Sequence, residues 1–292
     1  MTTFQTAGPF TLHVDIAVRA DIHVIAADHG TTQVHIRPRD VSRSLDVTAA
    51  EQAVVDHTPG RLTVKLKPPR LVGWFTDGGA VDITIEVPIG CELDLVTAMG
   101  DIQCHGEFAS ATLETAMGHI RIDHCQDLKA KTAMGDVTAE RVAGAANIRT
   151  SSGVIRIEEI DGEALVQNGN GDTSIDSITG TAHLKAGNGN ITLEHAGTDV
   201  IATSACGNIA LGEVTQGTVT AQSASGSIGI GVREGSAAWL DLSAKYGRAH
   251  NDLEPANGPG SATSRVQIRA RTPHGDITVQ RSPFTASRGT LL

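Results

Sequence analysis

The sequence predicts an all-β protein built as a parallel β-solenoid of about eight coils, each 18 residues long. Three observations predict it: a short glycine motif recurs at a fixed spacing, aliphatic residues alternate with polar ones between the glycines, and equivalent positions carry similar residues. In each motif a glycine is followed by a second residue, usually polar, and then usually by an aliphatic one. The anchor glycines, separated by steps of 18, 17, 18, 18, 18, 18 and 19 residues, are Gly100, Gly118, Gly135, Gly153, Gly171, Gly189, Gly207 and Gly226.

Each repeat contains the pattern of two short strands. Counted from the anchor glycine, aliphatic residues fall at positions +2 and +4, at +7, and at +11 and +13, as in Ile155, Ile157, Ile160, Ala164 and Val166. Alternation with a period of two places these side chains on one face of a strand, and no apolar spacing typical of a helix persists. We therefore expect turns at the anchor and near +9, and a right-handed coil, as in most parallel crossovers. The pattern leaves open whether a coil has two or three faces.

Polar residues repeat at the corner that contains the anchor. The third residue before each anchor is Thr97, Thr115, Thr132, Thr150, Asn168, Ala186, Ser204 and Ser223. If coils stack about 4.8 Å apart, these side chains form a column. Small hydroxyl and amide groups there are expected to satisfy turn backbone groups and to bond to their own kind in the next coil.

The repeat divides the chain into three predicted parts. Residues 1–88 are expected to form an N-terminal meander of strands and a cap, since Thr11 to Arg37 alternates without a glycine anchor. Within this part, Ala49 to Val55 fits a short helix or a strand. Residues 89–232 form the solenoid repeats, and residues 233–292 form an irregular C-terminal cap. Val266 to Val279 is expected to close that cap as a hairpin-like return that reuses the anchor motif.

Composition restricts partners and location. The chain has 23 basic and 33 acidic residues and a formal net charge of −10, which argues against nucleic acid as a partner. No basic segment followed by an apolar one opens the sequence, and no stretch of about 18 apolar residues could span a membrane, so a cytoplasmic protein is expected. Four cysteines lack the spacing of a zinc site or a disulfide framework. We expect Cys91, Cys104, Cys125 and Cys206 to be small buried hydrophobic residues.

Several motifs in fixed order resemble a known family. They are the alternating run Val81 to Pro88, the serial Ala-Met-Gly-Asp and Asn-Gly-Asn-Gly-Asp sequences, the segment Ala238 to Asp241, and Gly275-Asp276-Ile277. Over nearly the whole chain the sequence resembles the DUF4097 family, also labelled putative adhesin, in its actinobacterial form. The resemblance implies a β-solenoid-like fold and supplies no catalytic residues. The adhesin label implies a cell-surface role, but the export signal that such a role requires is missing here, which indicates a cytoplasmic type.

The candidate site is a column of carboxylates at position +5 on the outward face. Carboxylates about 4.8 Å apart repel by about 0.9 kcal/mol in water and by about 3.5 kcal/mol at an effective dielectric constant of 20. Either nearby arginines such as Arg121 and Arg156 offset this repulsion within a solvated face, or the column docks a basic partner or divalent cations. The predicted partner-binding residues are Asp123, Glu140, Glu158, Asp176 and Glu194. A second column at +14, with Lys131, Arg149 and Lys185, lies on another face and suggests side-by-side association of copies.

The sequence favours a non-catalytic scaffold or protein-interaction module that binds a protein partner or copies of itself. No catalytic residue, cofactor, metal site or small-molecule ligand is expected. His124 and His195 share position +6 but lie four coils apart, about 19 Å, which is too far for one metal ion. The alternative is a carbohydrate-active or carbohydrate-binding β-helix protein. Only eight aromatic residues are available as sugar platforms, which weakens this alternative.

Overall fold

A computed structural model confirms the β-solenoid, with almost all of its regular structure in strands and most of the strands paired in parallel. It describes residues 2–5, 10–28, 30–67, 78–254 and 264–282. The chain forms two compact units, residues 1–157 and 158–292. The inward aliphatic positions are buried as predicted: Ile155, Ile160 and Ala164 are fully buried, and Ile157 and Val166 are nearly so.

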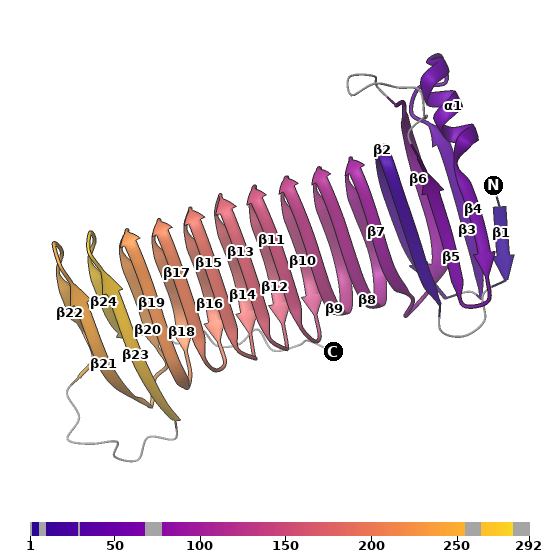
Figure 1. Ribbon diagram of the computed structural model, residues 1–292. Helices are drawn as coiled ribbons and strands as arrows, with labels where there is room; N and C mark the ends of the chain where they lie inside the picture. The colour runs from indigo at the N-terminus through magenta and orange to yellow at the C-terminus, as the bar shows by residue number, and fades with distance from the viewer. Residues whose placement is uncertain (1, 6–9, 29, 68–77, 255–263, 283–292) are drawn as a thin grey trace. The chain divides into compact units, whose positions relative to one another are not determined.

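Unit 1 contains one helix and eleven complete strands among its described residues (Figure 1). The strand β12 (Ile155–Ile160) begins in unit 1 and ends in unit 2. The elements are β1 (Thr2–Gln5), β2 (Thr11–Ala27), β3 (Thr31–Pro38), α1 (Ser44–Gln52), β4 (Val54–Thr58), β5 (Arg61–Leu66), β6 (Ala80–Pro88), β7 (Glu92–Met99), β8 (Ile102–Met117), β9 (Ile120–Met134), β10 (Val137–Val142) and β11 (Ala146–Ser152).

The glycine repeat sets the register between the coils of unit 1. Strand β8 pairs in parallel with β9, with Ile102 opposite Ile120 and Met117 opposite Met134. Strands β10 and β11 both pair in parallel with β9, so the two halves of one coil lie on one continuous strand of the coil before it. Equivalent residues of successive repeats therefore lie beside each other, as the period predicts.

The N-terminal strands differ from the expected meander. Strand β2 is itself a full coil: Leu12 pairs in parallel with Leu62 on one side and Leu93 on the other, and Ile22 pairs with Ile83 and with Ile102. Antiparallel pairing is confined to β1 with β3, β3 with β6, and β4 with β5 among the described strands. An alternating strand offers the same buried face to a parallel or an antiparallel neighbour, so local sequence cannot distinguish the two.

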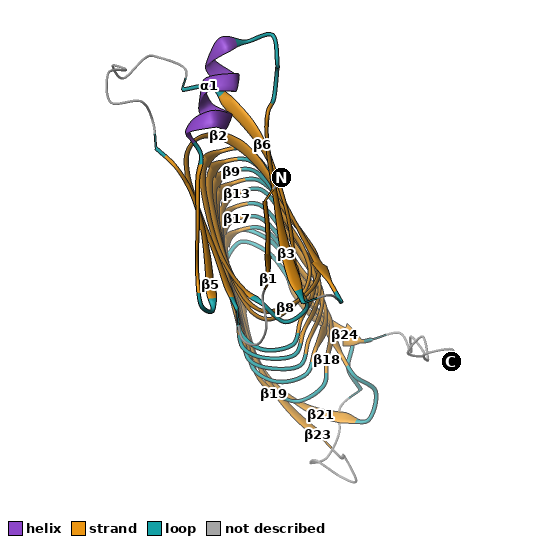
Figure 2. Cartoon of the chain, turned by 90° about the vertical axis from the view of Figure 1, so that its right-hand side faces the viewer, coloured by secondary structure: helices purple, strands orange, loops and turns teal. Residues whose placement is uncertain are grey.

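The ambiguous segment before β4 is a helix followed by a strand. Helix α1 (Figure 2) ends at Gln52 and packs against β3 and β6, and its buried residues are Asp46 and Ala49. The Asp46 carboxylate accepts hydrogen bonds from the backbone N–H of Ala80 at 2.9 Å and of Asp40 at 3.2 Å. The helix is thereby joined to the start of β6.

Unit 2 continues with two strands per coil (Figure 1), so its coils have two faces. Its elements after β12 are β13 (Ala164–Asn170), β14 (Thr173–Ile178), β15 (Ala182–Asn188), β16 (Ile191–Ala196), β17 (Val200–Cys206), β18 (Ile209–Val214), β19 (Gly217–Ser225), β20 (Ile228–Val232), β21 (Ser236–Ala244), β22 (Ala249–Asn251), β23 (Ser264–Thr272) and β24 (Ile277–Arg281). One ladder runs β13, β15, β17, β19, β23, β21, and the other runs β14, β16, β18, β20, β24, β22.

The C-terminal return is a coil and not a hairpin. Strand β23 pairs in parallel with β19 on one side and with β21 on the other, and β24 pairs in the same way with β20 and β22. Gly275 takes the anchor position beside Gly226, and Gly247 lies beside Gly275 in the next coil. The last coil in the sequence is therefore the penultimate coil in space. Residues 255–263 and 283–292 of the predicted cap lie outside the described residues.

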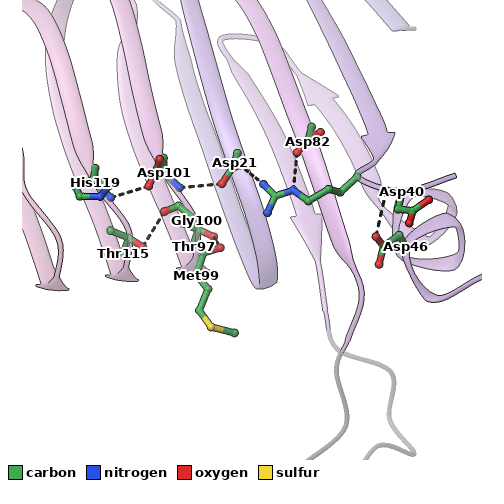
Figure 3. Close-up of polar contacts among 11 residues, drawn as sticks. Asp21, Asp40, Asp46, Asp82, Thr97, Met99, Gly100, Asp101, Thr115 and His119 are labelled. Carbon is green, nitrogen blue, oxygen red and sulfur yellow. Dashed lines mark hydrogen bonds and ion pairs between the residues drawn. The ribbon is translucent and has the colours of Figure 1, made fainter. Parts of the chain in front are cut away.

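Two polar ladders join the coils at the anchor corner (Figure 3). In the first, a Thr or Ser hydroxyl donates to the anchor carbonyl of the coil before it, at 2.8–3.2 Å: Thr115 to Gly100, Thr132 to Gly118, Thr150 to Gly135, Ser204 to Gly189, Ser223 to Gly207 and Thr272 to Gly226. This confirms the predicted role of the hydroxyl column. Bonding between like residues also occurs, since the Asn188 amide donates to Asn170 Oδ1 at 2.7 Å.

The second ladder explains the polar residue after each glycine. Asp101 Oδ1 accepts from the backbone N–H of His119 at 2.8 Å (Figure 3), and Asp172, Asn190 and Asn208 accept in the same way from the residue one coil later at 2.8–2.9 Å. Each such bond satisfies a backbone donor at a corner where no strand partner is available. The motif is therefore structural.

Candidate interaction surface

In unit 1 the predicted carboxylates Asp123 and Glu140 lie on β9 and β10. Glu140 lies between Ala139 and Arg141, which pair with Ile122 and His124, so Glu140 is one coil from Asp123. In unit 2, Glu158 belongs to β12, Asp176 to β14 and Glu194 to β16, and Asp176 and Glu194 lie between paired residues in the same manner. Within each unit the column is thus a row of carboxylates at one-coil spacing.

In unit 1 the two carboxylates of the column are used within the fold. Asp123 is largely buried and accepts a hydrogen bond from the backbone N–H of Gly106 at 3.1 Å, and it lies 3.3 Å from His105 Nδ1. Glu140 forms an ion pair with Arg121, with 3.3 Å between Oε1 and the guanidinium nitrogen. The sequence predicted the arginine as a neutralising neighbour. The sequence did not indicate that the Asp123 carboxylate accepts a hydrogen bond from the backbone of the bulge at Gly106.

In unit 2 the three carboxylates of the column are exposed. Glu158, Asp176 and Glu194 form no ion pair with any of the residues that the structure describes, and Arg156, although it is in the same strand as Glu158, does not reach it. Their mutual repulsion, about 0.9 kcal/mol per neighbouring pair in water at a spacing of about 4.8 Å, is therefore uncompensated by this unit's described side chains. We call these three residues the acidic strip.

A groove in unit 1 was not predicted from the sequence. Its volume is about 500 Å³, and its lining includes Phe108, Cys125 and three polar side chains from successive coils, Glu107, His124 and Arg141. The groove forms where β8 contains one extra residue relative to β9, with Gly106 at a φ of 101°. The signal in the sequence is Gly106 itself, a glycine off the anchor position. Glu107 and His124 form no hydrogen bond with each other among the described contacts.

The cysteines divide into a buried set and an exposed residue. Burial raises the pKa of Cys91 and of Cys125 to about 12 and raises the pKa of Cys104 well above its ordinary value. These three are the small hydrophobic residues that the sequence predicted. The same prediction is wrong for Cys206, which is exposed because it occupies the outward corner position before an anchor, between Asn188 and Ser225.

Thiol labelling of the folded protein should modify Cys206 and leave the other three cysteines unmodified. Only thiolates react, and a thiol with a pKa of about 12 is almost fully protonated between pH 7 and 9, while burial also blocks access. Mass spectrometry after maleimide treatment should find one adduct, and Cys206→Ser should abolish it. Labelling of Cys104 without denaturant would contradict this burial pattern.

None of the described helices has the length and apolar character needed to cross a membrane. The described His, Cys, Asp and Glu side chains form no group of three or more that could hold a metal ion.

Comparison with known proteins identifies the family. The family model described as Toastrack DUF4097 matches residues 12–280, while no curated protein matches. Among solved structures, a putative adhesin from Bacteroides fragilis is 15% identical with a TM-score of 0.33, and a putative lipid binding protein from Parabacteroides distasonis is 12% identical with a TM-score of 0.37. Each alignment covers 95% of both chains. The chain belongs to the Toastrack DUF4097 family.

Proposed function

We propose that this protein is a non-catalytic interaction module that docks a basic protein partner along its column of outward carboxylates. The observation that carries the proposal is the acidic strip: Glu158, Asp176 and Glu194 are exposed, regularly spaced and without ion pairs among the described residues. In unit 1, Asp123 and Glu140 occupy the same position of the repeat and also serve the fold.

Electrostatic interactions with the acidic strip would favour binding of a basic partner. Lysine or arginine side chains laid along it would remove the repulsion between neighbouring carboxylates and add attraction to each of them. The strip is rigid, because backbone ladders on both sides fix the strands that carry it. Little conformational entropy is then lost on binding, apart from that of the side chains.

The test is differential capture from an extract of the native cell. Wild type should capture basic proteins that elute when salt is added. The triple variant Glu158→Lys, Asp176→Lys and Glu194→Lys should not capture these proteins. A matched control with the same change in charge, Glu51→Lys, Glu163→Lys and Glu234→Lys, replaces exposed acidic residues elsewhere and should retain them. If both variants capture the same proteins, the strip is not the docking surface.

We also propose that the protein works in the cytoplasm. All four cysteines are free thiols, including the exposed Cys206, and such thiols persist in a reducing compartment. Cell fractionation that found the protein outside the cytoplasm would overturn this placement.

A further inference from the structure

The coil that ends unit 2 has one open side. Among the described strands, β21 pairs only with β23 and β22 only with β24, so no described strand pairs with the other edge of either. The inward residues Leu240 and Leu242 of β21 are only half-buried, whereas Ile268 and Ala270, their partners on β23, are fully buried. An open strand edge over a partly exposed core is a surface that proteins normally cover.

Two exposed aromatic residues and a cavity mark this end coil. Trp239 is 56% exposed and Tyr246 is 68% exposed. A cavity of about 790 Å³ opens beside Trp239, with Leu240 and Leu253 also in its lining and Arg265 and Arg281 among its polar groups. Large aromatic side chains beside an apolar cavity are typical of the centres of protein interfaces.

We propose that the end coil binds the end coil of a second copy of this chain, in a closed two-fold dimer that extends both sheets by antiparallel pairing. The charges in β21 and directly beside the ends of β21 and β22 point to this occupant. Suppose that β21 pairs antiparallel with β21 of the second copy, with the two Ser243 residues opposite each other. Asp241 of each copy then lies opposite Lys245 of the other, which gives two equivalent pairs by symmetry. If β22 pairs with its copy in the same way, with the two His250 residues opposite each other, Arg248 of each copy lies opposite Asp252 of the other.

A single two-fold axis can relate β21 to its copy and β22 to its copy. The middle of the corner that joins β21 to β22 lies between Tyr246 and Gly247. Ser243 and His250 are equally far from this point along the chain. An axis perpendicular to both sheets can therefore pass close to both residues. The charged side chains face outward on their strands, since the alternate residues Leu242 and Ala249 pair with the buried positions Ala270 and Ile277.

The same pairing covers apolar surface of the end coil. It places Tyr246 of each copy opposite Leu240 of the other, and Leu240 is one of the residues that line the cavity. Within each copy Asp241 Oδ2 lies 3.2 Å from Arg269 and 3.4 Å from Arg271 on β23, and Asp252 lies 2.7 Å from His250, so the pairs with the second copy add to contacts that each carboxylate already makes. Complementary charges then fix the register while aromatic and aliphatic groups are buried.

The assembly should stop at two copies. In unit 1 the outermost parallel strands are covered by antiparallel partners, β6 by β3 and β5 by β4, and by helix α1. That end offers no equivalent open parallel coil, so stacking does not propagate into a filament. This inference does not depend on the acidic strip, whose residues lie on β12, β14 and β16.

Sedimentation of charge-reversal variants tests the dimer. Wild type at about 100 µM should sediment with twice the 30.4 kDa chain mass. Arg248→Asp or Asp252→Arg alone should weaken the dimer about 100-fold, because an attraction is replaced by a repulsion at two symmetric places. The double variant should restore it. Circular dichroism should show the same fold in all variants, which separates lost association from lost structure.

Disulfide trapping tests the register. Ser243 should lie opposite itself, and opposed residues of antiparallel strands have Cα atoms about 4.5–5.5 Å apart, within disulfide range. In a Cys206→Ser background, Ser243→Cys should form a covalent dimer under mild oxidation, while the exposed control Ser151→Cys should not. A wild type that remains monomeric, or equal cross-linking at both sites, would overturn the proposal. A monomer whose end cavity takes up an apolar dye would assign that cavity to a small ligand instead.

Discussion

Gly135→Ala should destabilise unit 1 by at least about 3 kcal/mol. Gly135 has a φ of 147°, which L-amino acids with a side chain rarely adopt, and an added Cβ would lie 1.9 Å from the carbonyl oxygen of Gly118 in the coil before it. Backbone atoms cannot rotate away as a side chain can. The coils would have to separate at the corner where the N–H of Gly118 donates to Met134 and the hydroxyl of Thr132 donates to Gly118.

Urea denaturation followed by circular dichroism measures this effect. The matched control is Gly229→Ala, because an added Cβ there meets nothing within 4 Å and the backbone has no positive φ. The control should change the free energy of unfolding by less than about 1 kcal/mol, and loss of chain entropy in the unfolded state favours a small gain. Equal stability of the two variants would show that the anchor position tolerates a side chain.

Asp46→Ala should lower the free energy of unfolding by about 3 kcal/mol and release helix α1 from β6. The Asp46 side chain is 2% exposed and accepts hydrogen bonds from the backbone N–H groups of Ala80 and Asp40, two residues that are far apart in sequence. Figure 3 shows the contact with Asp40. Alanine would leave the Ala80 donor buried without an acceptor. A buried unsatisfied donor costs more than the hydrogen bond itself contributes.

Hydrogen exchange separates release of the helix from general loss of stability. Amide protection should fall first in residues 44–52 and at Ala80, while β8 and β9 should keep their protection. Glu51→Ala is the control on the same helix, because Glu51 is exposed. Uniform loss of protection across unit 1 would show that Asp46 does not act locally.

The sequence predicted where the carboxylates of the candidate surface lie, but it did not predict which of them contact other side chains or backbone groups. The period placed Asp123, Glu140 and Asp176 at one outward position, and the structure places them on one ladder within each unit. Which carboxylates are neutralised depends on neighbours that the period does not specify. His105 and Gly106 contact Asp123 only because β8 bulges there, whereas Arg156 lies in the same strand as Glu158 and does not reach it.

The sequence by itself determined the local structure of this protein: the strands, the corners, the buried positions and the residues that repeat from coil to coil. These follow from side-chain alternation and from glycine at the anchor, which act over a few residues. Only the tertiary structure decided that β2 is inserted as a coil beside β7, that β23 lies between β19 and β21, and that β21 and β22 form the open end. An alternating strand buries the same face whether its neighbour is parallel, antiparallel, near or distant in sequence, so the order of coils is set by which arrangement covers the most core.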